Sequence, residues 1–248
     1  MIPMNLQMLA LAASSALFAT STIFSQDVAP ASEAAADLPR MVRVQAEFIE
    51  MPHAIYTKLM ADPRASANDT DLRAECAKLI EAGDARIIES LAVISQPGSY
   101  ATTEDIQEFV YPTEYEPSSF SPSPWETLQF QVGGPPPPPF AFETKNVGST
   151  FEVETQINAN LPLIEIRCTP TLVYHVGKSV WSTWTDNEVT IESSKPRFYV
   201  LKVRTGTTLV SGQAQMVAAL SPQDEQGWMD SSRKVMTFLR GDIITVGK

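Results

Sequence analysis

Histidine and cysteine are scarce in this chain of 248 residues, which contains two of each. Neither His53 nor His175 has a cysteine, histidine or carboxylate partner at the spacing of a metal-ligand motif, and the sequence has no GxSxG, HExxH or CxxC pattern. We therefore expect no catalytic residue, no metal site and no cofactor. Cys76 and Cys168 leave two alternatives open: a disulfide, as exported proteins form, or two buried thiols.

Basic residues are also few. The chain has 18 Lys and Arg against 29 Asp and Glu, a net charge of -11, which argues against nucleic acid as a partner because phosphate contacts need clustered cations. No Lys or Arg lies between Arg86 and Lys145, where every charged residue is a carboxylate. This acidic stretch is either a solvated surface, a cation site or a face that binds a basic partner.

Long hydrophobic runs are confined to the N-terminus. Residues 1–26 contain no charged side chain and hold an apolar stretch typical of an export signal, so we expect a signal peptide there, with a single membrane anchor as the alternative. Residues 27–40 follow as a flexible, polar leader. Beyond them no apolar run approaches the roughly 18 residues that a membrane-crossing helix needs. We expect an exported protein with no membrane-spanning helix after the signal is removed.

The region 41–111 predicts one strand, two short helices and a hairpin. Apolar and polar residues alternate through 42–50, which indicates a strand. One short helix is expected after Pro52, and a second over about 70–82, begun by Asn68 or Asp69 and ended at Gly83. The hairpin follows, with QPGS between two segments of strand character.

Proline interrupts every periodic pattern between residues 112 and 140. The segment contains Pro112 and, near its end, five consecutive prolines that begin at Pro135. Proline lacks the amide donor that a strand ladder needs, and consecutive prolines favour the extended polyproline II conformation. We expect 112–140 to be a stiff, exposed connection without strand pairing.

The remaining residues, 141–248, predict strands almost throughout. Together with 41–111, with which they can form one domain, they predict an α+β fold that is mainly β. We expect an antiparallel β-sandwich-like core with one or two short helices near the N-terminus, for which an immunoglobulin-like sandwich is an alternative description. Trp181 and Trp184, with Tyr174 nearby, either form an aromatic surface for a ligand or partner or pack against the sheet.

Two glycine-containing segments match phosphate-binding loops only in part. Gly177-Lys178-Ser179 lacks the glycine five positions earlier, where Leu172 stands instead. Neither this segment nor VRTGTTLVSG at 203–212 is followed by a helical pattern, whose first amides would face the phosphates. We interpret neither segment as a nucleotide site.

Four segments, in this order along the chain, resemble the secretin domain, the outer-membrane ring component of type II and type III secretion systems and type IV pili. VRVQAEFIE is similar to its opening strand, and ARIIESLAVISQPGSYATTE to its hairpin. NVGSTFEVETQINANLPLIEIRCTP is similar to a central strand pair, and VRTGTTLVSG to the strand, turn and strand near its end. The resemblance implies that Gly148 and Gly206, the glycines of the VG and TGTT segments, permit tight turns.

The chain departs from the secretin pattern in two places. Where secretins carry the strands of the gate and of the membrane-spanning hairpins, this chain has the proline-rich segment, and RGDIITVGK matches the family's terminal V-P-x-L-G-D-I-P signature only faintly. The resemblance thus implies a shortened secretin-like scaffold without those hairpins.

The resemblance also implies a function. It points to a non-enzymatic structural or binding component of a type IV pilus or secretion assembly, at the periplasm, outer membrane or cell surface, or secreted, that associates with itself and with other proteins of the apparatus. The alternative is an adhesin-like β-sandwich that binds glycans or host proteins through Trp181 and Trp184. An acidic hydrolase is a third class, because glycoside hydrolysis needs only two carboxylates and the chain has many.

Overall fold

The structure is a computed structural model that describes residues 38–63, 68–115, 138–158, 160–186, 189–224 and 226–246. The expected signal peptide and most of the leader lie outside the described residues. Among the described residues, no helix is both long enough and apolar enough to cross a membrane.

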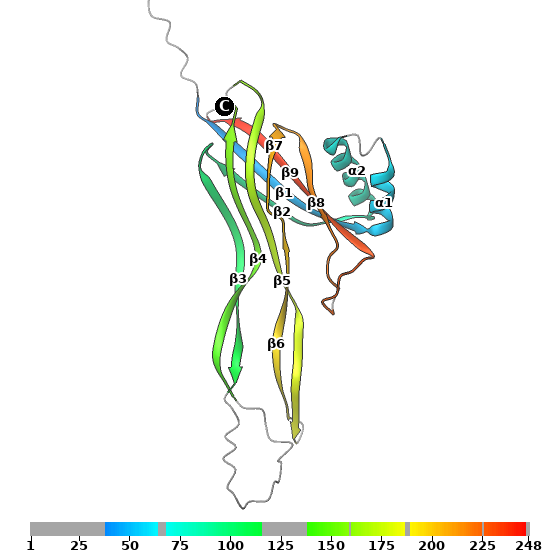
Figure 1. The fold of residues 1–248 in the computed structure, drawn as a ribbon, viewed down its shortest axis with the longest axis vertical. Helices are drawn as coiled ribbons and strands as arrows, with labels where there is room; N and C mark the ends of the chain where they lie inside the picture. Colours follow the sequence, from blue (N-terminus) through cyan, green and yellow to red (C-terminus); the bar gives the residue numbers. More distant parts are fainter. Residues whose placement is uncertain are drawn as a thin grey trace, which may run out of the picture. The chain divides into compact units, whose positions relative to one another are not determined.

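Sheet A contains four antiparallel strands in the order β2-β1-β9-β8 (Figure 1). Its strands are β1 (Arg40–Pro52), β2 (Arg86–Ser95), β8 (Ala214–Leu220) and β9 (Arg233–Thr245). The alternating segment at 42–50 is therefore confirmed as a strand, and it lies at the centre of this sheet.

Sheet B contains five strands. Three of them are ordered β3-β4-β5, and both β6 and β7 pair with the free side of β5. All of its pairings are antiparallel. Its strands are β3 (Tyr100–Tyr115), β4 (Pro139–Ile157), β5 (Leu163–Asp186), β6 (Val189–Lys202) and β7 (Thr205–Val210). β7 pairs with the first residues of β5 and β6 with the remainder, so these two strands follow one another along the same side of β5.

The main hydrophobic core lies between the two sheets. Alternate residues of β1, from Val42 to Phe48, point toward sheet B and are fully buried. They meet a facing set from sheet B: Phe151, Val153, Ile164, Ile166, Leu172, Leu201 and Leu209. Burying each large apolar side chain stabilises the fold by about 1.5–3 kcal/mol. This packing confirms the predicted antiparallel, sandwich-like core.

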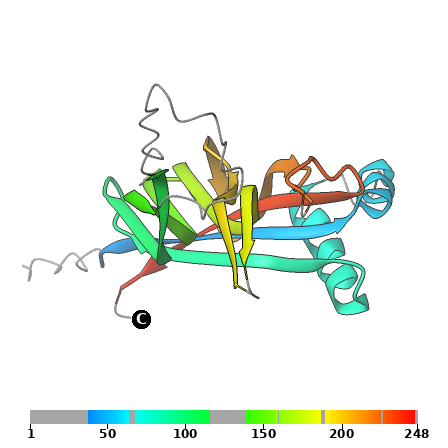
Figure 2. The same cartoon turned by 90° about the horizontal axis from the view of Figure 1, so that it is seen from below.

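Two helices cover the other face of sheet A. The odd-numbered residues Ile49 and Met51 of β1 are buried in a second cluster with Leu72 and Cys76 of α2 (Asp69–Ala82). α1 (His53–Ala61) packs against the same cluster, and Figure 2 shows both helices at one end of the sheet A strands. The molecule is thus α+β and mainly β, as predicted, and this helical layer has no counterpart in an immunoglobulin-like sandwich.

Both ends of α2 lie at the residues that the sequence predicts. The Asn68 side chain accepts a hydrogen bond of 2.8 Å from the Asp71 amide, and so satisfies one of the free N–H groups of the first turn. Gly83 adopts a left-handed conformation with φ of 80° after the last turn. Both caps were predicted from the residue types alone.

A buried carboxylate ties β1 to β2 and β9. Glu50, whose side chain is 6% exposed, accepts a hydrogen bond of 2.6 Å from Nε of Arg86 and another from Nη1 of Arg233. Arg233 also donates from Nε to Asp230, at 2.6 Å. A buried charge with two cationic partners costs far less free energy than an unpaired one.

Sheet B divides into two hairpin arms. Between Gly148 and Glu154, β4 pairs with β3 and β5 at once. Past Gly148, β4 continues with β3 alone, while β5 continues with β6 alone (Figure 1). We call these the β3–β4 arm (107–115 with 139–147) and the β5–β6 arm (174–186 with 189–199).

The β3–β4 arm is longer than the sequence predicts. We expected 112–140 to lack strand pairing, but the ladder continues through Pro112, opposite Phe142, to Tyr115, opposite Pro139. An edge strand tolerates proline because the missing donor need not face a partner, and the register shifts directly after Pro112. The remainder of that connection, 116–137, lies outside the described residues.

Candidate interaction site

The outer edges of sheet B carry no partner strand. β3 pairs only with β4, and β6 and β7 pair only with β5, within the part of the chain that the structure describes. Unpaired edge strands present rows of free N–H and C=O groups that can pair with another chain. These two edges are therefore the first candidate for an interaction site.

The two edges differ in charge. β3 contains no Lys or Arg, and its four carboxylates are exposed: Glu104, Asp105, Glu108 and Glu114. The opposite edge exposes three cations, Lys195, Lys202 and Arg204. None of these seven side chains forms an ion pair with another described residue. The acidic stretch noted in the sequence is thus, in part, one edge of a sheet.

An apolar cleft of about 670 Å³ lies between the two arms. Phe109 of β3 stacks on His175 of β5, with ring centroids 4.8 Å apart, and meets Phe198 of β6 edge-on at 5.6 Å. Farther along the arms, Tyr115 donates a hydrogen bond of 3.3 Å to the Ser194 carbonyl. Aromatic contacts therefore hold the two arms together, and His175 packs among these rings.

Tyr174 and Trp181, two of the three aromatic residues that the sequence singled out, contact different neighbours. Tyr174 stacks on Tyr199, with centroids 6.3 Å apart, and packs against the main core. Burial there raises the pKa of the Tyr174 hydroxyl to about 12. Trp181 is 56% exposed and meets Tyr115 edge-on at 5.7 Å. The Trp184 side chain lies outside what the structure describes.

Both cysteines are free and buried. Cys168 lies in the core between the sheets, whereas Cys76 lies in the cluster under the helices. Burial raises the pKa of Cys76 to about 11 and that of Cys168 to about 12. Neither thiol is therefore a reactive thiolate at neutral pH.

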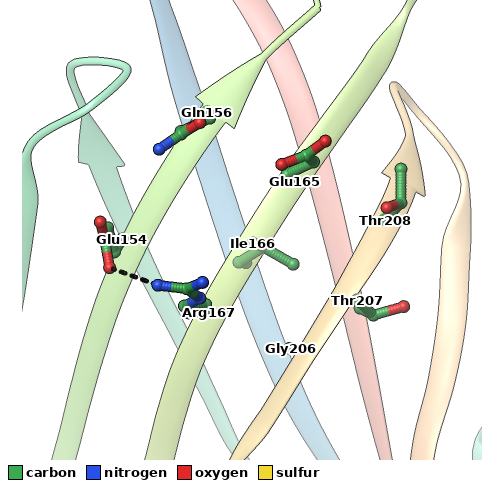
Figure 3. Close-up of a pocket in the computed structure, with 8 residues that line it drawn as sticks. All are labelled: Glu154, Gln156, Glu165, Ile166, Arg167, Gly206, Thr207 and Thr208. Atoms are coloured by element: carbon green, nitrogen blue, oxygen red, sulfur yellow. Dashed lines mark ion pairs between the residues drawn. The ribbon is translucent and has the colours of Figure 1, made fainter.

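The outward face of sheet B holds an open polar pocket of about 390 Å³ (Figure 3). Glu154 and Gln156 come from β4, Glu165 and Arg167 from β5, and Thr207 from β7. Arg167 and Glu154 are 4.0 Å apart and exposed, so solvent screens their attraction. No group of three metal-ligating side chains occurs among the described residues.

Gly148 and Gly206, which the resemblance to secretins places in tight turns, do not lie in turns. Gly206 lies within β7 opposite Arg167, and Gly148 lies within β4 opposite Ile106. The turn of the segment 203–212 occurs instead at Gly212, where φ is 84°. This segment is a strand followed by a turn into β8, which agrees with its rejection as a phosphate loop.

No family model and no curated protein matches the chain. Among solved structures it is similar to the secretin domain of InvG from the Salmonella SPI-1 injectisome, at 10% identity and a TM-score of 0.44, over 85% of this chain and 64% of that one. It is similar to Aeromonas hydrophila ExeD at 16% identity and a TM-score of 0.43, over 84% of this chain and 49% of that one.

It is also similar to the type II secretin GspD of enteropathogenic Escherichia coli, at 12% identity and a TM-score of 0.42, over 84% of this chain and 70% of that one. The chain thus spans between 49% and 70% of the length of these three proteins. Secretin is the family that the sequence motifs resemble.

Proposed function

We propose that the protein is an exported, non-enzymatic structural component of a secretin-type envelope assembly, in a protein secretion system or a type IV pilus, that binds further copies of itself through the edges of sheet B. The observation that carries this proposal is the pair of open edges. A sheet that ends on both sides in long, exposed strands, with acidic side chains on one and basic side chains on the other, is built to continue into another chain.

The placement of the four secretin-like segments supports the family named in this proposal. The first is β1, the second spans β2 and the start of β3, the third spans the pairing of β4 with β5, and the fourth is β7 with the turn that follows. They therefore supply strands to both sheets. The β3–β4 arm also supplies paired strand at both ends of the proline-rich segment, where secretins carry the strands of the gate and of the membrane-spanning hairpins. The departure from the secretin pattern is therefore smaller than the prolines implied.

The described residues give the two alternatives less support than the open edges give the proposal. The adhesin alternative places its ligand on Trp181 and Trp184, of which Trp181 is exposed and meets Tyr115, while the Trp184 side chain lies outside the described residues. The hydrolase reading needs two carboxylates in a cleft. The apolar cleft contains one carboxylate, Glu192, whose partner is Lys178, and the open polar pocket contains two, Glu154 and Glu165, of which Glu154 faces Arg167.

Sedimentation and fractionation of the full-length protein test this proposal. Expressed in a Gram-negative host with its native N-terminus, the protein is expected in the envelope fraction, and detergent-extracted material is expected to sediment as discrete species larger than a monomer. Treatment with a protease from outside and after osmotic shock distinguishes a surface from a periplasmic location. A protein found only in the medium, and monomeric at every concentration, contradicts the proposal.

A further inference from the structure

We propose that the apolar cleft between the two arms binds a proline-rich segment of another protein, one that carries a Lys or Arg beside its prolines. The proposed function concerns contacts between copies through the edges of sheet B, whereas this cleft is lined by the two arms of a single copy. The inference therefore adds a second kind of partner, and it does not depend on association between copies.

The cleft presents aromatic and aliphatic side chains to a ligand. Aromatic residues of β3 and β5 line it: Phe109, Tyr111, Tyr115 and His175. Its volume of about 670 Å³ lies within the range of about 300–1,000 Å³ that ligand pockets occupy. Val110 and Ile191 also line the cleft and are 61% and 40% exposed, so part of its apolar surface is in contact with water. A ligand that covers these side chains gains the free energy of removing that surface from water.

Proline already lies beside these rings. Pro138 and Pro139 are consecutive and both line the cleft, and Pro139 lies directly opposite Tyr115 in the β3–β4 ladder. Aromatic-lined grooves bind proline-rich segments because a polyproline II helix is extended before it binds and loses little conformational entropy. The lining of this cleft therefore suits a ligand of consecutive prolines.

A hydroxyl group in the cleft is free to bind such a ligand. Ser193 lines the cleft, and its side chain forms no hydrogen bond with another described residue. The backbone carbonyls of a polyproline II helix have no internal hydrogen bonds, so one of them can accept a hydrogen bond from this hydroxyl. This contact would fix the position of the ligand along the cleft.

The charges beside the cleft favour a ligand with a cation. Glu108 and Glu114 of β3 are exposed on either side of the residues that line it, and neither forms an ion pair with another described residue. Lys178 also lines the cleft, but Glu192 already neutralises it. A Lys or Arg beside the prolines of the ligand therefore meets uncompensated carboxylates, and such complementarity of charge supplies specificity.

Calorimetric titration of the purified protein with a synthetic peptide of consecutive prolines, flanked by an arginine at each end, tests this inference. We expect saturable binding of one peptide per chain, and about tenfold weaker binding to Tyr115→Ala, which removes a ring from the cleft. Ile191→Ala, on the opposite arm, is also expected to weaken binding. Tyr100→Ala is the matched control, because Tyr100 lies at the other end of β3, is 64% exposed and is outside the lining of the cleft.

Two altered peptides test the chemistry of the ligand. Alanine in place of the prolines should abolish binding, and glutamate in place of the arginines should weaken it about tenfold at low ionic strength. Circular dichroism establishes that each protein variant is folded, and Ile191→Ala decides the result if Tyr115→Ala does not fold.

Binding that depends on the prolines and on the cleft residues, but not on Tyr100, supports the inference. A wild-type protein that binds no proline peptide overturns it, whether residues 116–137, a second copy or water fills the cleft. Binding that neither cleft variant weakens, or that the alanine peptide matches, overturns it as well. The proposed function stands in each of these cases, because it depends on the edges of sheet B.

Discussion

Gly148 is a residue at which substitution should be costly. Its φ is 128°, a conformation that side chains other than glycine rarely adopt. An added Cβ would lie 2.1 Å from the carbonyl oxygen of Asp105 and 3.1 Å from Cα of Ile106. Both atoms belong to the backbone of β3 and are held by the ladder to β4, so neither can move away without breaking strand pairing.

Two terms set the magnitude for Gly148→Ala. The strained backbone costs about 1–3 kcal/mol and the steric overlap about 1–3 kcal/mol more, so we expect a loss of about 2–6 kcal/mol in the free energy of unfolding. The total stability of a domain is about 5–15 kcal/mol, so this loss is large. Because both arms begin at Gly148, the pairing of β3 with β4 should suffer first.

Urea denaturation followed by circular dichroism measures this loss, and Gly206→Ala is the matched control. Gly206 is also a mid-strand glycine of sheet B, but its φ is not in the left-handed region and an added Cβ would approach no atom closer than 3.7 Å. We expect the control to change stability by less than about 1 kcal/mol. If Gly148→Ala were as stable as this control, the reasoning from backbone strain would be refuted.

Three further predictions concern buried and paired groups. Glu50→Ala removes a buried acceptor of hydrogen bonds from two arginines that water can still reach, and should destabilise the protein by about 1.5–3 kcal/mol in urea denaturation, whereas a loss below about 0.5 kcal/mol would contradict the role assigned to this carboxylate. Cys76 and Cys168 should resist alkylation at pH 8 until urea unfolds the protein, and rapid labelling of the native state would show that their burial is wrong. Hydrogen bonds, above all that from the Ser232 hydroxyl, lower the pKa of Asp230 to about 2. The stabilising effect of Asp230 is therefore present above the pKa of the unfolded state and is lost as the pH falls toward 2. The free energies of unfolding of wild type and Asp230→Asn should differ at pH 6 and converge in acid. A difference that grew in acid would contradict this sign.

Local signals in the sequence predicted the parts of the fold that depend on local chemistry. The alternation from Val42 to Phe48 identifies β1 and its buried face, and Asn68 and Gly83 mark the ends of α2. In each case a few neighbouring residues determine the outcome, either by burial on alternate positions or by satisfying a helix end.

Features that depend on distant strands were not predictable in the same way. The extension of β3 through Pro112 depends on its position at the edge of sheet B, which the sequence does not reveal. Gly148 needs glycine because β3 approaches it closely, not because the chain turns there. The composition showed an acidic stretch, but the opposition of Glu104 to a basic edge appears only when the register of four strands is known.

Cysteine cross-linking tests the edge-to-edge contact most directly. Glu104 lies opposite Thr150, Thr150 opposite Thr171, and Thr171 opposite Lys202, so a chain with both Glu104→Cys and Lys202→Cys has a thiol on each edge at the same height of sheet B. If the acidic edge of one copy binds the basic edge of the next, mild oxidation of the assembled protein should give a ladder of covalent dimers, trimers and larger species, and either substitution alone should give none. Covalent dimers from Glu104→Cys alone, or no ladder from an assembled double variant, would contradict assembly through the two edges of sheet B.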